Sequence, residues 1–494
     1  MAKQPNLVFL LNDHQLHYRH GWEEGPRIQR MYFDRLAAEG VRFDRAYSVC
    51  PLCGPARRSM LTGLYPHHHG EIHNDINHPF DRDTYLDLLA TAGYRNFYFG
   101  KWHAGPGNAH DHHCEGFSYP SYNNPYTKPE YREYLERHHL PEPEILVEKN
   151  FLWKKDTEGC IIRQDMGWCN EHASGLMLTP RETHESFFLA SLACDQLREL
   201  SRQRSDSNEN RPFSLRVDFW GPHQPYFPTM EYARLYDPKE IPVYGNFNDT
   251  LKDKPDTYHE EGNAGISMNG RLIQPNPIPW KEWQKVLARC YAQITQVDAA
   301  GGMILNCLAE LGLDDNTLVV WSADHGDALA CHGGHFDKRA YMPEEMLRIP
   351  MAIRFPGKIP PGQCSDQLVS NMDIPVTLLD ASGLNFPGGC DGRSLLEVAS
   401  GTGSGPVGQD DLMCESYGHG QKVFARILLT ERYKYIHTRN YMDELYDLQK
   451  DPYELNNLAV RQDCREILMD MQRRLKKKQA EVGDDPGFII ASLY

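Results

Sequence analysis

The stretch Thr317-Leu318-Val319-Val320-Trp321 is the clearest strand in the sequence, and Ser322-Ala323-Asp324-His325-Gly326 follows it directly. Its apolar run is short, rich in β-branched residues and uninterrupted, which is typical of a strand that is buried on both faces of a sheet. Asn6-Leu7-Val8-Phe9-Leu10-Leu11 has the same character and leads into Asn12-Asp13-His14. We therefore expect both stretches to be central strands of a mostly parallel sheet.

Helical segments alternate with these strands along the chain. Further strands are predicted over residues 96–99 and 214–219, and helices over residues 28–39, 179–202 and 281–311. The second helix opens with Thr179-Pro180-Arg181-Glu182, which has the pattern of a capping box with proline at the first helical position. Alternating strands and helices predict an α/β fold with a large, mostly parallel central sheet sandwiched by helices.

The last quarter of the chain has a different pattern. Residues 400–406, Ser-Gly-Thr-Gly-Ser-Gly-Pro, have the composition of a flexible link. After them, three short strands (412–417, 423–430 and 433–437) precede a helix over residues 461–482. We expect a smaller C-terminal α+β subdomain with an antiparallel sheet over residues 389–494, following a catalytic α/β domain over residues 1–388.

Two parts of the larger domain are predicted to be insertions. Residues of about 105–178 and 225–279 are rich in aromatic and polar side chains and lack sustained periodicity. Binding loops often have this composition. The alternative is that they are surface loops without contact to a substrate.

Composition excludes several classes of protein. The 494 residues carry a net charge of −16, which argues against nucleic acid as a partner. No apolar run approaches the ~20 residues of a membrane span. Residues 1–11 lack the apolar stretch and cleavage site of a signal peptide, so we expect a cytoplasmic protein without a membrane partner.

The cysteines do not form a disulfide framework. There are 13 of them, an odd number, and they lack the paired spacing of secreted proteins. Cys50-Pro51-Leu52-Cys53 has the C-x-x-C spacing of half a zinc site or of a redox motif. Since no second C-x-x-C or H-x3-H pair accompanies it, we consider this alternative weak.

Acidic and imidazole side chains follow both central strands. Asp13 and His14 come after the first strand, and Asp324 and His325 after the strand at 317–321. Ligands of such sheets bind at the carboxyl ends of the strands, so the two pairs can meet there. Oxygen and nitrogen ligands suit one divalent cation, with Mn²⁺, Zn²⁺, Ca²⁺ and Mg²⁺ all open.

Several cationic residues follow other predicted strands. Lys101 and His103 are two residues apart, so they point the same way in an extended segment. His223 lies between two prolines. Each of them could be an ordinary surface residue, but their order along the chain favours a single site. One short loop after the Asp324 motif adds His332, His335 and Lys338.

The most specific motif is Cys53-Gly54-Pro55-Ala56-Arg57, with Leu61-Thr62-Gly63 downstream. It closely resembles the signature of type I sulfatases, which belong to the alkaline-phosphatase superfamily. The resemblance extends over nearly the whole chain. It includes Gly100-Lys101-Trp102-His103, the Pro-His-Gln-Pro-Tyr run at 222–226, the Asp-His-Gly run at 324–326, and Glu444-Leu445-Tyr446-Asp447-Leu448.

The resemblance implies a hydrolase that cleaves sulfate monoesters. In this family the cysteine is oxidised to formylglycine (3-oxoalanine) by a maturation enzyme, and the aldehyde hydrate is the nucleophile. The aromatic and histidine-rich composition of the first insertion favours a small substrate, namely a sulfated sugar, an aryl sulfate or an alkyl sulfate. Sulfate and an alcohol or sugar would be released, and a homo-oligomer is compatible with the sequence.

The family's roles can be carried over by position. The nucleophile would be Cys53, which Arg57 would hold. The metal ligands would be Asp13, Asp324 and His325, with His14 at a fourth position. His103 would contact the formylglycine hydroxyl, and His332 and His335 are candidate substrate-binding residues. The sulfate oxygens would be held by Lys101, His223 and Lys338.

Two positions depart from the family pattern. A second acid usually stands where this chain has His14, which favours Mn²⁺ over the family's common calcium. Ala56 stands where serine is commoner.

Two other functions remain open. The first is a phosphonate or phosphate mono- or diester hydrolase of the same superfamily, which the retained Gly-Lys-Trp-His run disfavours. The second is a binding protein with an unconverted Cys53, which the complete set of cationic site residues disfavours.

Overall fold

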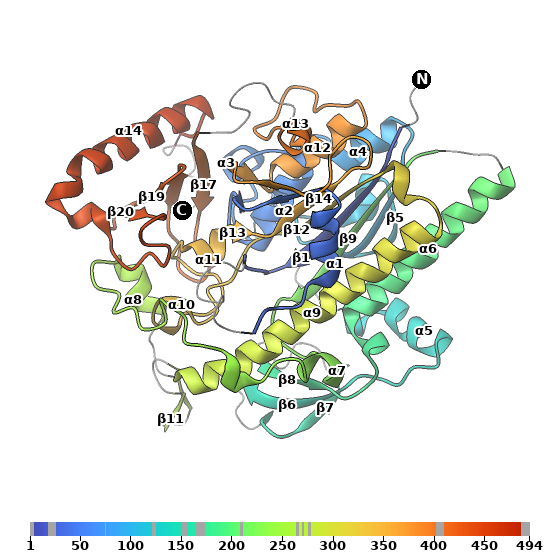
Figure 1. Cartoon of the computed structure of the whole chain (residues 1–494), viewed down its shortest axis with the longest axis horizontal. Helices are drawn as coiled ribbons and strands as arrows, with labels where there is room; N and C mark the ends of the chain where they lie inside the picture. Colours follow the sequence, from blue (N-terminus) through green and yellow to red (C-terminus); the bar gives the residue numbers. More distant parts are fainter. Residues whose placement is uncertain are drawn as a thin grey trace.

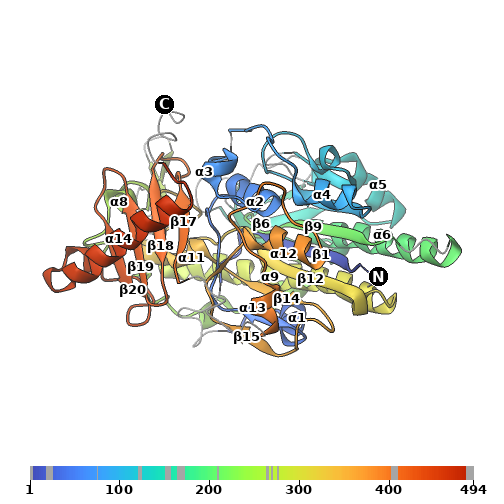
Figure 2. The same ribbon diagram turned by 90° about the horizontal axis from the view of Figure 1, so that it is seen from above.

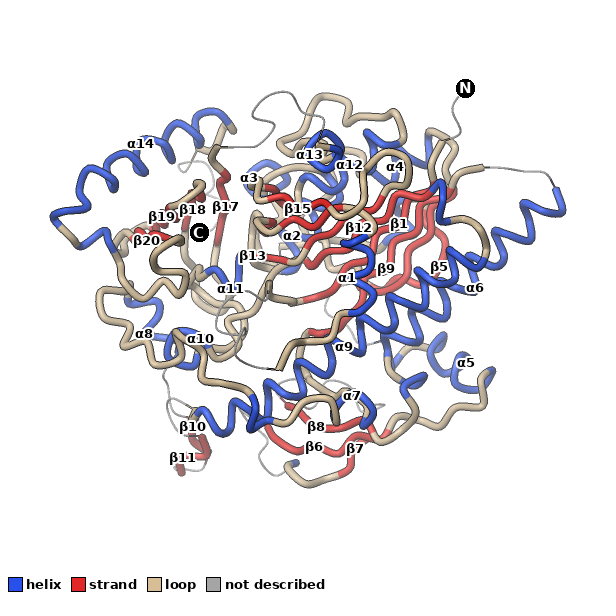
Figure 3. Tube along the Cα trace, in the orientation of Figure 1, coloured by secondary structure: helices blue, strands red, loops and turns tan. Residues whose placement is uncertain are grey.

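The computed structural model describes residues 4–17, 26–74, 76–120, 125–150, 157–163, 173–207, 211–262, 266–268, 271–274, 278–401 and 410–485. Within these residues the largest sheet has eight strands in the order β15-β2-β14-β12-β1-β9-β4-β5 (Figures 1 and 3). The five strands from β12 to β5 are parallel, whereas β14 is antiparallel to its neighbours. The strands, in sheet order, are Gln363–Ser365, Val41–Phe43, Met351–Arg354, Thr317–Ala323, Asn6–Asp13, Phe213–Pro222, Arg95–Lys101 and Cys114–Tyr119.

The middle of this sheet consists of the strands predicted to be central. Every residue of β1, β9 and β12 is buried. The pairing of β1 with β12 sets Leu10 beside Trp321 and ends with Asn12 beside Ala323. The predicted α/β fold class is thus confirmed, and Asp13 and Asp324 follow at the same edge of the sheet.

Helices cover both faces. On one face, α1 (Met31–Ala38), α6 (Glu185–Ser207) and α9 (Trp280–Glu310) pack together over the sheet in one apolar cluster. The other face carries α2 (Cys53–Thr62), α4 (Tyr85–Thr91) and α12 (Asp373–Ala381) in a second cluster. The sheet is therefore buried on both sides, which explains the continuous apolar runs of its central strands.

Two predicted helices begin later than expected. The helix predicted from residue 28 begins at Met31. The predicted capping box at Thr179 does not form, because Arg181–Thr183 is a single 3-10 turn and α6 begins at Glu185. The Thr183 hydroxyl instead lies 2.6 Å from the Thr179 hydroxyl and donates to the Pro180 carbonyl at 2.8 Å. These local hydrogen bonds satisfy the side chains that would have capped a helix.

The first turn of α1 is capped by a residue from α9. The Asp298 carboxylate accepts the backbone N–H groups of Tyr32 at 2.9 Å and Phe33 at 2.8 Å. We expect Asp298→Ala to lower the free energy of unfolding by about 1–2 kcal/mol, because two N–H groups of a helix start lose their acceptor. Urea-induced unfolding measures this loss. Glu310→Ala, at the exposed end of the same helix, is the control, and an equal effect of the two changes would contradict the assignment.

The two predicted insertions carry elements of their own. The range 105–178 holds α5 (Pro129–Arg137) and the sheet β7-β6-β8 (Ile161–Arg163, Glu144–Asn150 and Ala173–Met177). Strand β5 lies in this range too, yet it pairs with β4 at the edge of the main sheet. The range 225–279 holds α7 (Met230–Ala233), α8 (Asp256–Gly262) and the hairpin β10-β11 (Ile266–Met268 and Arg271–Gln274).

An antiparallel sheet lies beside the main body, towards the C-terminal end of the chain (Figure 2). It consists of β17 (Leu412–Ser416), β18 (Ala425–Leu429), β19 (Tyr433–Thr438) and β20 (Glu444–Asp447), and α14 (Arg465–Glu481) packs on it. Three of the strands and the helix were predicted, whereas β20 was not.

Short elements connect this sheet to the larger one. They are α3 (Pro66–His69), α10 (Cys331–Gly334), α11 (Glu344–Leu347) and the sheet β13-β3-β16 (Arg348–Ile349, Ala46–Tyr47 and Val369–Ser370), whereas α13 (Leu396–Ser400) packs with α12 on the main sheet. Residues of α11, such as Met346 and Leu347, share an apolar cluster with Ile427 and Ile436 of the antiparallel sheet. Most of the predicted link, residues 402–406, lies outside the described residues, and the domain boundary at 388/389 stays a prediction.

Among the described residues, no helix combines the length and the apolar character that a membrane span requires.

Candidate active site

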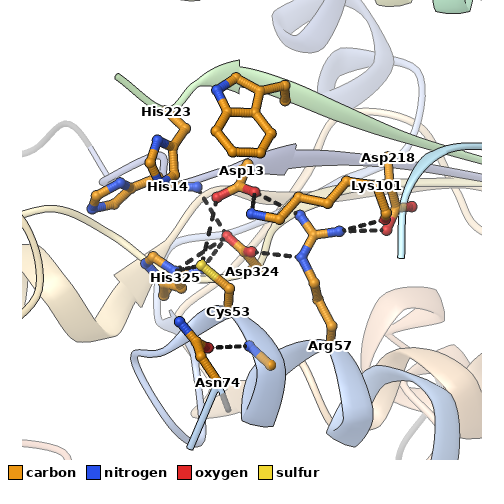
Figure 4. A network of polar contacts seen from close by, with 12 residues as sticks. Asp13, His14, Cys53, Arg57, Asn74, Lys101, Asp218, His223, Asp324 and His325 are labelled. Carbon is orange, nitrogen blue, oxygen red and sulfur yellow. Dashed lines mark hydrogen bonds and ion pairs between the residues drawn. The ribbon is translucent and has the colours of Figure 1, made fainter. Parts of the chain in front are cut away.

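The first residue of α2 lies at the carboxyl edge of the main sheet, facing the ends of β1 and β12 (Figure 4). This residue, Cys53, is fully buried. Its Sγ is 3.1 Å from His325 Nε2 and 3.9 Å from Asp13 Oδ1. Burial raises the pKa of the thiol, but the charges of Lys101 and Lys338 outweigh this and lower it. Position 53 therefore favours a negatively charged or strongly polarised group.

The second residue of α2 is Gly54, and its contacts with Asn74 explain why glycine follows Cys53. The Gly54 N–H donates to the Asn74 side-chain oxygen at 2.9 Å. A Cβ atom at residue 54 would lie 3.3 Å from the Asn74 Cα atom and 3.2 Å from its Oδ1. Larger residues would push the Asn74 segment away from the start of α2.

Arg57 lies one turn further along α2 and connects three carboxylates. Its guanidinium donates to Asp13 at 3.0 Å, to Asp218 at 2.8 Å and to Asp324 at 3.0 Å, and all four side chains are fully buried. Burial would lower the pKa of Arg57, but the three carboxylates raise it, so the guanidinium stays charged. Arg57 thereby fixes Asp13, at the end of β1, and Asp324, which follows β12.

Four potential ligand atoms converge at this point. Asp13, Cys53, Asp324 and His325 each offer one atom, and these atoms all lie within 4.8 Å of one another. His325 Nδ1 donates to the Gly326 carbonyl at 2.8 Å, so the Nε2 atom is directed towards Cys53. Two carboxylates and an imidazole held in one tautomer fit a divalent cation.

Two lysines bring positive charge to the same place. Lys101 forms an ion pair with the Asp13 carboxylate, and its Nζ lies 4.5 Å from the ring centre of Trp220. Lys338 Nζ is 3.1 Å from Asp337 Oδ1. Burial lowers the pKa of Lys338, but Asp337 and Cys53 raise it above its ordinary value. The Lys338 ammonium group is therefore charged in a site of low dielectric constant, where it attracts anions strongly.

Two histidines complete the set of predicted catalytic residues. His223 Nδ1 donates to the Gln224 carbonyl at 2.7 Å, and burial followed by Lys338 lowers the pKa of His223 well below its ordinary value. Burial and then Lys101 and Arg57 have the same effect on His103. Both imidazoles are neutral, so each can accept a proton or a hydrogen bond.

The strand before Lys101 depends on a glycine. Gly100 has φ of 117°, and a Cβ atom there would lie 2.1 Å from the Asp218 carbonyl oxygen. Any other residue would separate β4 from β9, so this glycine lets Lys101 reach Asp13.

Comparison with known proteins identifies the family of a chain with this arrangement of site residues. Residues 5–384 match the family Sulfatase, and residues 331–481 match the family described as N-sulphoglucosamine sulphohydrolase, C-terminal. The chain belongs to the sulfatase family. It is a sulfatase enzyme, as the resemblance of the Cys53 motif predicted.

Individual relatives cover nearly the whole sulfatase chain. An N-acetylglucosamine-6-O-sulfatase of Bacteroides thetaiotaomicron is 28% identical over 98% of this chain and 88% of its own length. A solved structure described as bound to its substrate D-glucosamine-2-N,6-O-disulfate has a TM-score of 0.73 at 22% identity, covering 98% of this chain and 99% of its own. The phosphonate monoester hydrolase of Agrobacterium radiobacter has a TM-score of 0.75 at 20% identity, covering 97% and 96%. The two structures show that the fold is shared.

His14 is placed differently from the other predicted ligands of the sulfatase. Its backbone N–H donates to Asp324 Oδ1 at 2.9 Å, but its ring nitrogen Nε2 lies 3.6 Å from Asp327 and 3.4 Å from Asp337. The ring is thus outside the four-atom cluster described above. Its role as a fourth ligand, and the preference for Mn²⁺ that rested on it, stay predictions.

The predicted substrate-binding histidines have other partners. His332 Nδ1 bonds to Asp249 at 2.9 Å, and His335 Nε2 lies 2.9 Å from the Tyr258 carbonyl oxygen. These contacts lead to the 225–279 segment and not to the residues around Cys53. Their role in substrate binding stays a prediction.

Several residues of the site were not predicted. Asp218 in β9 accepts hydrogen bonds from both Arg57 and Arg216. A single acidic residue within a largely apolar strand was the sequence feature that could have identified it. Glu185 accepts the Gly221 N–H at 3.0 Å, and Gln293 donates to the His223 carbonyl at 3.1 Å. These two residues, from α6 and α9, hold the loop that presents His223.

Cys50 does not share the environment of Cys53. It is buried and free, and in the described chain it belongs to neither group of potential metal ligands. Burial raises its pKa well above the ordinary value, so Cys50 has the character of a small apolar residue.

Proposed function

We propose that this sulfatase hydrolyses a sulfate monoester of a small sugar, with residue 53 as formylglycine and one divalent ion beside it. The observation that carries the proposal is the position of Cys53, which lies between three potential metal ligands and two buried lysines. Such a site binds an anion and brings a reactive group at residue 53 next to it. It releases inorganic sulfate and an alcohol.

Different residues of the site would bind the metal ion, neutralise the sulfate charge and position the metal ligands. A divalent ion bound by Asp13, Asp324 and His325 would polarise a sulfate oxygen, and formylglycine at residue 53 would supply a hydroxyl nucleophile. Lys101 and Lys338 neutralise charge on the sulfate oxygens. Arg57 keeps Asp13 and Asp324 in position through the contacts described above.

Proton transfer requires a donor and an acceptor. Lys338 is charged in the free protein, whereas the His223 imidazole is neutral. Lys338 is therefore the better proton donor to the departing alcohol oxygen, and His223 would bind a sulfate oxygen. The neutral imidazole of His103 can accept a proton from the hydroxyl of residue 53.

The proposed substrate is a sulfated amino sugar. Support comes from the relative named as an N-acetylglucosamine-6-O-sulfatase and from the similar structure described with D-glucosamine-2-N,6-O-disulfate. A second support is a pair of imidazoles, His73 and His419, whose ring centres are 5.9 Å apart. Burial and then Lys338 lower the pKa of His419 to about 4, which places a neutral hydrogen-bonding ring near the cationic pocket. Sugar hydroxyl groups suit such a ring.

A phosphonate or phosphate ester is the alternative substrate, because the phosphonate monoester hydrolase has the same fold. The pairing of Lys101 with Asp13 and the neighbouring His103 favour the sulfate ester, since the Gly-Lys-Trp-His run belongs to the sulfatase pattern.

A substrate panel tests the proposal. Sulfate release is followed by ion chromatography for N-acetylglucosamine 6-sulfate, D-glucosamine-2-N,6-O-disulfate, an aryl sulfate and choline sulfate, and phosphonate or phosphate release for an aryl phosphonate ester and a phosphate diester. We expect kcat/KM for a sulfated amino sugar to exceed that for the phosphorus esters by at least about 100-fold. Faster cleavage of the phosphonate would establish the alternative. A sulfated polysaccharide is added to the panel, and cleavage of this polymer alone would exclude a small substrate.

We also propose that a formylglycine-generating enzyme of the cytoplasm matures the chain. Ala56, in place of the commoner serine, leaves the recognised Cys-x-Pro-x-Arg spacing unchanged.

A further inference from the structure

A second group of potential metal ligands lies between the main sheet and the C-terminal sheet (Figure 1). Cys331 and His332 belong to α10, and Glu345 belongs to α11. Their ligand atoms all lie within 4.8 Å of one another. The first two residues are each 1% exposed. Thiolate, imidazole and carboxylate together are the ligand types that Zn²⁺ prefers.

The imidazole of this group is already oriented as in metal sites. His332 Nδ1 bonds to Asp249 Oδ2 at 2.9 Å, which leaves Nε2 facing Glu345 at 3.8 Å. In metal sites a carboxylate commonly fixes the tautomer of a ligating histidine in this way. The Asn246 amide donates to Glu345 Oε1 at 2.7 Å and lies 3.3 Å from His332 Nε2. Asn246 and Asp249 therefore hold two of the three ligands from the 225–279 segment.

A small cavity lies against Cys331 and Glu345, whereas His332 is not part of its wall. Its water-accessible volume is about 20 Å³, and its wall includes Cys331, Glu345, Asn246 and His17. A cavity of roughly 10–15 Å³ is enough for one water molecule, so a single ion fits here. His17 adds a second imidazole to the wall.

The lysine and arginine side chains near this group contact other residues, so they do not neutralise the Glu345 carboxylate. Lys254 lies 3.8 Å from Asp249, and Lys434 lies 3.4 Å from Glu344 and 2.8 Å from Glu454. Arg348 also borders the cavity, but its guanidinium donates to the Asp44 carbonyl. In the described chain, Glu345 has no lysine or arginine within 4.0 Å. A dication would balance the charges of the Glu345 carboxylate and the Cys331 thiolate.

The backbone at these ligands is held in an uncommon conformation. His332 has φ of 46° and Ala330 has φ of 72°, both in the left-handed region. Such residues cost on the order of 1–3 kcal/mol each and are retained where the surroundings require them. The turn brings ligand atoms of Cys331 and His332, which are adjacent in sequence, within 4.8 Å of each other and of a Glu345 oxygen.

We propose that Cys331, His332 and Glu345 bind one Zn²⁺ ion at a structural site that is separate from the active site. Binding forms one bond each to Cys331 Sγ, His332 Nε2 and a Glu345 oxygen, with His17 or a water molecule as the fourth ligand. The thiol proton of Cys331, and any proton on Glu345, is released to solvent. The ion ties α10 to α11 and thereby steadies the loop that carries Lys338 into the active site.

The full-length Cys53→Ser protein tests the proposal, because serine removes the other thiol that could bind the metal. Metal-free protein is loaded with Co²⁺ and, separately, with Zn²⁺. We expect a thiolate-to-cobalt absorption band in the near ultraviolet, and we expect elemental analysis to show one more tightly bound zinc per chain than in the Cys53→Ser/Cys331→Ser protein. Asp249→Asn in the same background should weaken zinc binding about 10–100-fold, because it removes the carboxylate that accepts from His332 Nδ1.

Cys114→Ser is the matched control, since Cys114 is a buried thiol in β5 whose sulfur faces the His112 carbonyl. It should leave the cobalt band and the zinc content unchanged. Absence of the band from the Cys53→Ser protein itself overturns the proposal, whether or not the Cys331→Ser variant folds. A band that persists in a folded Cys331→Ser variant also overturns it.

Discussion

Replacing Cys53 by alanine should abolish sulfate-ester hydrolysis, with a loss in kcat/KM of about 10⁴-fold or more. The reason is that residue 53 is the only proposed nucleophile, and it sits within contact distance of His325 and near Asp13. The remaining lysines and metal ligands would still bind the sulfate group. We therefore expect substrate binding to persist when it is measured by calorimetry, while sulfate release in a coupled assay disappears.

Cys50→Ala is the control for this change, because Cys50 is equally buried and lies three residues away. It should retain nearly full activity. Mass spectrometry of the peptide that spans residues 49–57 completes the test. An active protein with an unmodified thiol at residue 53 would rule out the formylglycine mechanism, and so would an active Cys53→Ala variant.

Arg57→Met should be the most destabilising single change near the site, with a loss of about 3–5 kcal/mol in the free energy of unfolding. The change removes one cation from among Asp13, Asp218 and Asp324, whose side chains have no exposure to water. Lys101 still pairs with Asp13 and Arg216 still pairs with Asp218, but the buried Asp324 carboxylate loses its guanidinium partner and has no water to replace it. Urea-induced unfolding of metal-free protein measures the effect, since a bound dication would offset part of it.

Arg58→Met provides the comparison at the next position. Arg58 is also buried, but its guanidinium donates to the carbonyl oxygens of Ala104 and Pro79 and lies 3.1 Å from the ring centre of Phe80. Methionine retains the contact with Phe80, and two carbonyl groups tolerate the loss better than three carboxylates. We expect a loss of about 1–2 kcal/mol. Equal losses at residues 57 and 58 would show that the three carboxylates do not depend on Arg57.

The sequence alone predicted those parts of the site that follow strands. Asp13 is the last residue of β1 and Asp324 comes directly after β12, and the parallel pairing of these two strands brings them together. Parallel strands present their carboxyl ends at one edge, so strand prediction was sufficient. Asp218 and Glu185 were missed because their importance comes from partners more than 30 residues away, Arg57 and Gly221.

Local sequence was least informative where side chains had two alternative partners. The Thr183 hydroxyl donates to the Pro180 carbonyl and lies beside the Thr179 hydroxyl, so a 3-10 turn forms in place of the predicted capping box. His14 shows the same difficulty in the site. Its position in sequence matched that of a metal ligand, whereas its ring lies nearer to Asp327 and Asp337, which no pattern along the chain connects to it.

The depth of Cys53 limits when it can be modified. Its side chain is inaccessible once α2 has docked against β1 and β12, so we expect the proposed maturation enzyme to act on it earlier. Cys53 and His325 are 272 residues apart in the chain. At synthesis rates of about 5–20 residues per second, the strand that closes the site is made on the order of tens of seconds after the cysteine. That interval on the ribosome sets the time available for the proposed maturation, and slower translation between these residues should raise the converted fraction.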